Sequence, residues 1–325
     1  MRRWARFLAR RLAQAVLIVL GIAVLNFFLL HLAPGDAADA MAGEAGNGDP
    51  AYLALLRQRY GLDQPLAVQL GRFLWRLASL DLGFSPRYGQ SVAALILERL
   101  PATLLLMFTS ITFAVLGGIA LGVTAARFAH RAADRVISLF VLLLYATPVF
   151  WTGLMMILLF SVKLDWLPAG GMIDMRARTT GLAYAADVAA HLVLPALTQA
   201  FFFLAIYTRL LRASMLEVMS LDYIRFARAK GMSEFRVAFR HALRNALPPL
   251  VTMVGMNVGT FLGGAVLGET VFSWPGIGRL MFDAVFQRDL NLLLSILVLS
   301  SIFVVLANLV VDILYVLLNP AVELQ

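Results

Sequence analysis

The chain has 325 residues, of which 61% are hydrophobic, and its mean hydropathy is +0.83. Soluble domains are about 45 to 50% apolar, so this composition excludes an ordinary soluble protein and predicts a polytopic helical membrane protein. The net charge of +8 comes from basic residues scattered between apolar runs, which argues against a nucleic-acid-binding face, and the lack of cysteine excludes disulfides, thiol catalysis and cysteine-based metal sites.

Six apolar runs follow one another, and we expect each to cross the roughly 30 Å of membrane hydrocarbon as a helix. They cover residues 12–32, 102–126, 136–162, 192–207, 250–271 and 292–314. The fourth is short, but Leu210, Leu211 and Met215 can extend it. The first follows the basic start MRRWARFLARR, which resembles part of a signal peptide. Its apolar run is too long for one and no clean cleavage site follows, so we interpret it as an uncleaved span. The expected fold class is an all-α polytopic membrane protein with six transmembrane helices.

Three basic segments indicate the orientation of these spans. Five arginines precede the first run, a basic loop follows the second, and residues 223–248 form a basic segment between the fourth and fifth runs. Six spans put all three on one side, which the positive-inside rule makes cytoplasmic. Both termini are then cytoplasmic. The expected parts are the N-terminus with the first span (1–32), an extracytoplasmic loop with short helices (33–100), a five-helix transmembrane domain (101–319) and a cytoplasmic tail (320–325).

The extracytoplasmic loop carries two stretches with helical spacing, residues 49–60 and 65–77. The second places Leu66, Leu70, Phe73, Leu74 and Leu77 on one face. These helices either cap the membrane or a partner protein, or lie on the bilayer surface, and the sequence leaves both alternatives open.

The spans carry almost no ionisable groups. Their polar exceptions are Asn26, Asn257, Asn308 and Asp312. Proton- or sodium-coupled transporters usually keep carboxylates or histidines at mid-membrane for the coupling ion, and this chain lacks them there. It also lacks the GxxxxGK[ST] pattern of a nucleotide-binding loop. Energy for uphill transport would therefore have to come from another polypeptide.

The basic segment is unsuited to lipid, because an arginine or lysine at the centre of a span costs about 2.5 to 3.5 kcal/mol. We expect residues 222–230 to form a short helix that ends at Gly231, where glycine accepts a positive φ. Met232 would then pack on Ala227 in a Schellman motif.

A second helix is expected to follow, with Ser233 as its N-cap and Glu234 at the positive end of its dipole. One apolar stripe would comprise Phe235, Ala238, Phe239, Ala242 and Ala246. One basic stripe would comprise Arg236, Arg240 and Arg244. Pro248 and Pro249 would open the fifth span, where proline in the first turn is tolerated. The alternative is a solvated loop docked on lipid headgroups, which does not require capped helices.

These residues resemble the cytoplasmic EAA loop of permease subunits from binding-protein-dependent ABC importers. The run DYIRFARAKG…RHALRNALPP is similar to the oligopeptide/dipeptide/nickel branch in particular. The resemblance covers nearly the full chain, through RRLAQAVLIVLGIAVLNFFLLHLAPGD, YGLDQPLAVQ, LDLGFS, ILERLPATL, ATPVFWTGL, HLVLPALT and ETVFSWPGIGRL in order. The chain departs from the general EAA pattern in two ways. Arg225 and Phe226 replace the leading Glu and Ala, and the spacing from Gly231 to the Leu-Pro pair is longer. Contacts of sugar-importer permeases are therefore not transferred to this chain.

The resemblance implies the six-helix fold of type I importer permeases, in which the helix before the glycine couples the permease to a cytoplasmic ATPase. In this chain the coupling loop would span residues 216–247. The candidate ATPase contacts are Asp222, Tyr223, Arg225, Phe226, Ala227, Arg228, Lys230 and Gly231. Either Phe226 or Tyr223 would be the apolar anchor, and the charges would set the register.

Further roles are expected for single residues. Pro148 lies inside the third run and predicts a kink, which is either a hinge of the translocation path or a packing feature. Candidate path residues are Tyr145, Pro148, Phe150, Trp151 and Asn257, although aromatic residues at such positions more often belong to a core. Candidates for an outer gate or a binding-protein contact are Glu269, Trp274 and Pro275. A structural turn is the alternative for the WPGIG sequence.

The chain would hydrolyse nothing and would carry no catalytic residue, metal or cofactor of its own. ATP and Mg²⁺ would bind two partner ATPase domains, and the other partners would be a second, homologous permease and an extracytoplasmic binding protein. The location would be the bacterial cytoplasmic membrane. Dipeptides or oligopeptides are the favoured cargo, with nickel or metal chelates, glutathione and opines as alternatives. A stand-alone secondary transporter and an intramembrane protease are disfavoured, because coupling-ion ligands and a paired Ser and His are missing from mid-membrane.

Overall fold

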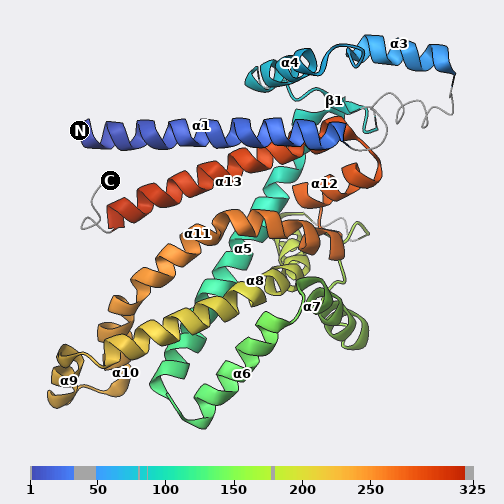
Figure 1. Ribbon diagram of the computed structural model, residues 1–325. Helices are drawn as coiled ribbons and strands as arrows, with labels where there is room; N and C mark the ends of the chain where they lie inside the picture. Colours follow the sequence, from blue (N-terminus) through green and yellow to red (C-terminus); the bar gives the residue numbers. More distant parts are fainter. Residues whose placement is uncertain (1, 33–48, 80, 86, 177–179, 319–325) are drawn as a thin grey trace. The chain divides into compact units, whose positions relative to one another are not determined.

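The computed structural model describes residues 2–32, 49–79, 81–85, 87–176 and 180–318 (Figure 1). The predicted tail 320–325 and the first part of the predicted outer loop, 33–48, lie outside the described residues. The chain divides into two compact units. Unit 1 comprises residues Met1–Pro101, Leu280–Leu309 and Asn319–Gln325, and unit 2 comprises Ala102–Arg279 and Val310–Leu318.

Unit 1 contains α1 (Arg2–His31), α3 (Pro50–Tyr60), α4 (Leu66–Ala78) and a two-stranded antiparallel hairpin of β1 (Phe84–Ser85) and β2 (Gln90–Ser91). It also takes the start of α5 (Val92–Arg127), the end of α12 (Ile277–Phe286) and most of α13 (Leu290–Leu318). The two short helices predicted in the outer loop are confirmed as α3 and α4.

Side-chain contacts hold unit 1 together at two places. The Phe27 ring of α1 lies 5.7 Å from the Phe73 ring of α4, and His31 Nε2 lies 3.2 Å from Gln69 Oε1. The β-hairpin is fixed to the start of α13, because the Asn291 amide donates to the Leu82 and Phe84 carbonyls at 3.3 and 3.1 Å. The apolar face predicted for α4 is thus partly used against α1.

Unit 2 is built around α8 (Gly181–Met219), many of whose side chains are buried. The other helices of this unit are α6 (Ala132–Ala146), α7 (Val149–Met156), α9 (Asp222–Ala229), α10 (Glu234–Arg236) and α11 (Leu243–Val271). Two π-helical segments are η1 (Ile157–Lys163) and η2 (Val237–Ala242). α5 approaches α8 closely at two glycines. A Cβ added at Gly118 would lie 2.7 Å from Cβ of Tyr207, and one at Gly122 would lie 3.0 Å from Cβ of Leu211.

Four helices among the described residues are long and apolar enough to cross a membrane. They lie at Ala9–Leu29, Val92–Arg127, Gly181–Met219 and Leu290–Val310. α6 followed by α7 and η1 would make a fifth span, bent by 106°. The protein is therefore a mostly helical membrane protein with four to five candidate spans. The fifth predicted run, 250–271, falls within α11, which is an unbroken helix over 29 residues.

The prediction of one kinked helix over residues 136–162 is wrong. α6 ends at Ala146, Thr147 is extended, and Pro148 precedes the first residue of α7. The ring of Pro148 disfavours helical geometry at Thr147, so the chain breaks there instead of bending within a helix. Pro248 and Pro249 also differ from prediction, because they lie inside α11 instead of opening it.

Candidate functional site

The corner at Gly231 is built as predicted. Gly231 has a φ of +76°, its amide donates to the Arg228 carbonyl at 2.9 Å, and the Met232 amide donates to the Ala227 carbonyl at 3.4 Å. These two bonds are the Schellman pair that ends a helix at a left-handed residue. Ser233 then caps the next helix by accepting from the Arg236 amide at 3.4 Å. The helix, corner and cap predicted from the sequence are confirmed.

α9 has one buried face, and this face fixes it to the end of α8. Ile224 and Ala227 are buried in one apolar cluster with Met215 and Val218 of α8. Val237, Ala238 and Ala242 of η2 join the same cluster. Ala227 therefore supports α9 from within, and its side chain is not presented to a partner in this conformation.

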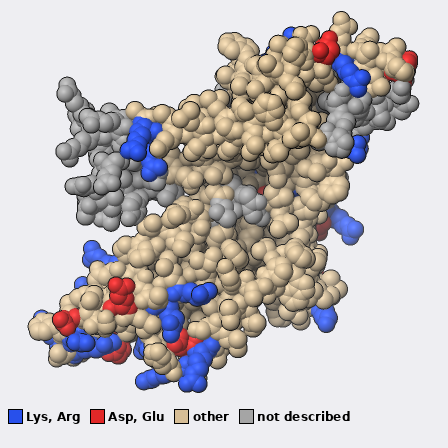
Figure 2. Space-filling model, in the orientation of Figure 1, with Lys and Arg blue, Asp and Glu red and all other residues tan. Residues whose placement is uncertain are grey.

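The opposite face of α9 is exposed and carries most of the predicted contact residues. Figure 2 shows that lysines and arginines gather at the end of unit 2 where α9 and α10 lie. The exposed members of the predicted set are Asp222, Tyr223, Arg225, Phe226, Arg228, Lys230 and Gly231. A capped helix with a fixed inner face thus presents a charged and aromatic outer face.

The two candidate apolar anchors differ in how freely they are presented. Phe226 is 63% exposed, and the Lys230 ammonium lies 4.7 Å from its ring centroid. Tyr223 is 41% exposed, and its hydroxyl accepts a hydrogen bond from Asn245 Nδ2 at 2.7 Å. The Phe226 side chain is therefore freely exposed on α9, whereas Tyr223 is tied back to α11.

Two ion pairs lie on this exposed surface. Arg228 makes two bonds to Glu234 across the Gly231 corner, at 2.9 and 3.3 Å, and Arg225 lies 3.3 Å from Asp222. Exposed pairs of this kind contribute about 0 to 1 kcal/mol each. Their charges remain accessible to a charged partner.

The predicted apolar stripe after Ser233 is wrong in part. Ala238, Ala242 and Ala246 are buried as expected, but Phe235 and Phe239 are exposed by 59% and 42%, with their rings 4.5 Å apart. The cause is η2, because a π-helical turn takes more residues than an α-helical turn and shifts the phase of the residues on either side. The basic stripe of Arg236, Arg240 and Arg244 is exposed as predicted.

The candidate path residues are not gathered into one cluster by the described contacts. The Tyr145 ring stacks on Phe202 of α8 with centroids 5.3 Å apart, and Asn257 lies beside the hydroxyl of buried Tyr207. Phe150 and Trp151 of α7 are each 49% exposed. Pro148 lies at the break between α6 and α7.

Glu269 and Trp274 are fully buried, where prediction placed them at an outer mouth. Glu269 accepts from Thr103 Oγ1 at 2.7 Å and from the Arg279 amide at 3.0 Å. The Trp274 indole donates to the Ala102 carbonyl at 2.9 Å, while Pro275 is partly exposed. This network ties the turn after α11 to α5. The expectation that the spans carry almost no ionisable group must be corrected, because Glu269 lies within the predicted span 250–271 and is buried.

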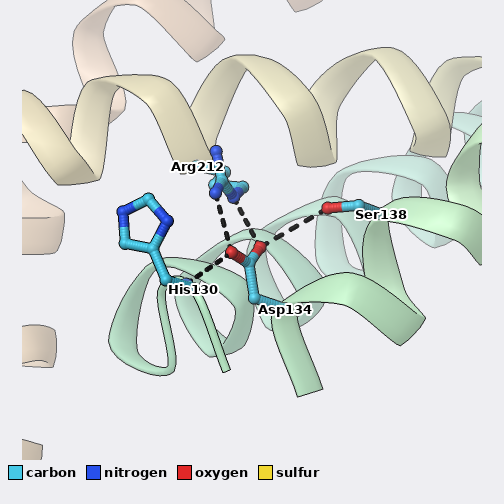
Figure 3. A network of polar contacts seen from close by, with 4 residues as sticks. All are labelled: His130, Asp134, Ser138 and Arg212. Carbon is cyan, nitrogen blue, oxygen red and sulfur yellow. Dashed lines mark hydrogen bonds and ion pairs between the residues drawn. The ribbon is translucent and has the colours of Figure 1, made fainter. Parts of the chain in front are cut away.

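Sequence reasoning missed Asp134 and Arg212. Asp134 of α6 is 4% exposed, and Arg212 of α8 donates to it from Nε at 2.6 Å and from Nη2 at 2.8 Å (Figure 3). One signal was available, since Asp134 is the only acidic residue in the basic loop 127–135. Its partner could not be identified, because it is 78 residues away.

Comparisons with known proteins cover nearly the whole chain. A family model described as binding-protein-dependent transport system inner membrane component matches residues 118–324, and the corresponding N-terminal model matches residues 4–107. The di/tripeptide transport system permease protein DppB of Pseudomonas aeruginosa is 41% identical over 98% of this chain and 99% of that protein. The oligopeptide transport system permease protein AppB of Bacillus subtilis is 39% identical over 98% of this chain and 99% of that protein.

A glutathione transport system permease protein, GsiC of Salmonella paratyphi A, is 40% identical over 98% of both chains. Among solved structures, an inward-facing MetNI methionine ABC transporter matches with a TM-score of 0.55 at 20% identity, over 68% of this chain and 94% of that chain. At this identity the structural match shows a similar fold alone.

Proposed function

Because the chain belongs to the family of binding-protein-dependent transport system inner membrane components, we propose that it forms half of the translocation pathway of an ATP-driven peptide importer. The observation that carries the peptide assignment is the full-length similarity to di/tripeptide and oligopeptide permeases at 39 to 41% identity. Glutathione is itself a tripeptide, so the similarity to a glutathione permease makes it the second candidate cargo.

The proposed membrane arrangement has six spans, with α11 as the span added to the four to five candidates. Both termini and α9 would lie in the cytoplasm, and α3 and α4 would lie outside it. The support is the clustering of lysine and arginine at the α9 end of unit 2 (Figure 2) and the positive-inside rule. A homologous second permease would complete the pathway, and a binding protein would deliver peptide to the outer face.

Energy would enter through α9, which we assign as the coupling helix. Phe226 would insert into a groove on the ATPase subunit, and Asp222, Arg225 and Lys230 would fix its register there. This assignment is supported by the exposed aromatic and charged face and by the buried face that connects α9 to α8. ATP and Mg²⁺ would bind the ATPase partners, and closure of those partners would move α9 and α8 together.

The proposed pathway residues remain Tyr145, Pro148, Phe150, Trp151 and Asn257. The break at Pro148 supports a hinge, since α6 and α7 are joined there through two extended residues, Thr147 and Pro148. For Glu269 and Trp274, burial favours a role in holding the outer end of the pathway over direct contact with a binding protein, whereas Pro275 beside them is partly exposed. Opening of that end would require the Glu269 network to rearrange.

Reconstitution tests the proposed function. The complete complex, with both permeases, the ATPases and the binding protein, is placed in proteoliposomes and supplied with labelled trialanine. We expect uptake that requires both ATP and the binding protein, and competition by unlabelled dipeptides or glutathione identifies the preferred cargo. Trialanine uptake that continues without ATP would contradict an ATP-driven importer. No uptake of any peptide, together with ATP-dependent uptake of a nickel chelate, would contradict the peptide assignment.

A further inference from the structure

Among the contacts described, the Asp134–Arg212 pair is the ion pair that joins α6 to α8, with the Asp134 carboxylate buried and the Arg212 side chain partly exposed. All the hydrogen-bonding capacity of the carboxylate is used. Arg212 binds both oxygens, the His130 amide donates to Oδ2 at 2.9 Å, and Ser138 Oγ lies 3.4 Å from Oδ1 (Figure 3). His130 has a φ of +65°, which is unusual for a residue other than glycine, so the turn before α6 is shaped around this carboxylate.

Burial and geometry make this contact rigid. The two parallel bonds from a planar guanidinium fix both distance and orientation, which a single bond would not. The Asp134 side chain is 6% exposed and the Arg212 side chain 28% exposed, so water replaces the partner poorly if the pair separates. α6 therefore has little freedom to slide along α8 at this point.

The same stretch of α8 is fixed to α9. Met215 and Val218 follow Arg212 on α8 and are buried with Ile224 and Ala227 of α9. Val141 of α6 belongs to the same cluster. A displacement of α9 would thus reach α8 through apolar packing and would reach α6 through both packing and the ion pair.

We propose that Asp134 and Arg212 are positioning residues for energy coupling, because they make α6 move as one body with α8 and α9. The motion is then delivered to the other end of α6, where the chain breaks at Thr147 and Pro148 and turns by 106° into α7. The pair acts as a permanent strut that stays closed throughout the cycle. This inference rests on the proposed function, in which α9 receives the motion from an ATPase.

The first test measures trialanine uptake per ATP hydrolysed in the reconstituted complex, with the variants Asp134→Asn and Arg212→Gln. We expect each to assemble with the ATPases and to keep basal hydrolysis while uptake per ATP falls about fivefold or more, the size of an ordinary coupling free energy. Asp187→Asn is the matched control. Asp187 pairs with His191 at 3.1 Å near the opposite end of α8, and its variant should couple normally.

A double variant controls for misfolding of the two single variants. Asp134→Leu combined with Arg212→Met leaves no unpaired charge, and apolar replacements of buried pairs are often neutral for stability. This double variant should assemble and still lose coupling, because apolar side chains do not fix the register of α6 on α8. Full coupling in the double variant would overturn the proposal.

A cross-link tests whether the Asp134–Arg212 contact stays closed throughout the transport cycle or must open during it. Because the chain has no cysteine, Asp134→Cys with Arg212→Cys can be joined by a short thiol cross-linker in a complex with cysteine-free partners. If the contact stays closed, cross-linking should restore uptake per ATP. A cross-link that blocks uptake would overturn the proposal. If the unaltered complex shows no ATP-dependent uptake, the proposed function fails. If it does and the variants couple normally, the strut alone fails.

Discussion

Gly231 combines a positive φ with open space around the position of a Cβ. No atom lies within 4 Å of a Cβ built there, so substitution affects the backbone conformation alone. A β-branched residue should cost about 1 to 3 kcal/mol at this φ, whereas asparagine tolerates the left-handed region. We predict that Gly231→Val lowers both the melting temperature and trialanine uptake per ATP, and that Gly231→Asn retains most of both. Equal behaviour of the two variants would show that the corner conformation does not matter.

Gly276 shows the opposite situation, in which space is the constraint. A Cβ at Gly276 would collide with the Glu269 carboxylate, and that group is held by Thr103 and the Arg279 amide. Gly276→Ala should therefore destabilise the protein by about 1 to 3 kcal/mol, as overpacking of a filled site does. Thermal unfolding in detergent measures this. Gly71→Ala in α4, where a Cβ meets nothing within 4 Å, is the control and should leave the melting temperature unchanged or raise it.

Among the elements, η2 lies between α10 and α11 and determines how α9 and α10 are rotated relative to α11. Deleting the exposed Arg240 would let η2 close into an α-helix and would turn the preceding residues by about 100° relative to α11. We predict that the deletion abolishes uptake, because α9 loses its packing on η2. The matched variant Arg240→Ala keeps the turn and should retain uptake. Normal uptake in the deletion variant would show that transport does not depend on the rotation produced by η2.

The sequence was sufficient where local chemistry decides the structure. Gly231, Ser233 and their neighbours specify a helix end and a helix start through contacts within a few residues. The π-helical turn of η2 could not be predicted, because tertiary packing against α8 and α9 stabilises it and no local residue pattern indicates a π-helix. The exposure of Phe235 and Phe239 followed from that turn and was missed with it.

Features that join distant parts of the chain could not be predicted either, because they also depend on tertiary packing. Pro148 predicted a disturbance of the third span, but the 106° angle depends on packing around Gly153. A Cβ there would lie 3.1 to 3.4 Å from Val271, Phe272 and Thr198, so α7 sits closely against α8 and the end of α11. The bond between Asp134 and Arg212 depends likewise on how α6 and α8 pack.

For the whole molecule, the proposed six-span arrangement predicts the side of the membrane on which each exposed residue lies. Single cysteines can replace Trp75, Met175 or Phe226, which are 74%, 87% and 63% exposed, in a chain without native cysteine. We predict that a membrane-impermeant maleimide labels positions 75 and 175 on intact spheroplasts and labels position 226 only after lysis. Labelling of position 226 on intact spheroplasts would reverse the orientation.

The proposed role of α9 is to deliver the energy of a partner ATPase to the spans, and the contact made by Phe226 is the most direct place to measure it. A photo-reactive benzoyl-phenylalanine at position 226, in the assembled complex in membranes, should cross-link to the ATPase subunit. The same group at position 75 should not. Cross-linking at position 226 to lipid or to the second permease alone, in a complex that still hydrolyses ATP in response to peptide and binding protein, would show that α9 is not the contact with the ATPase.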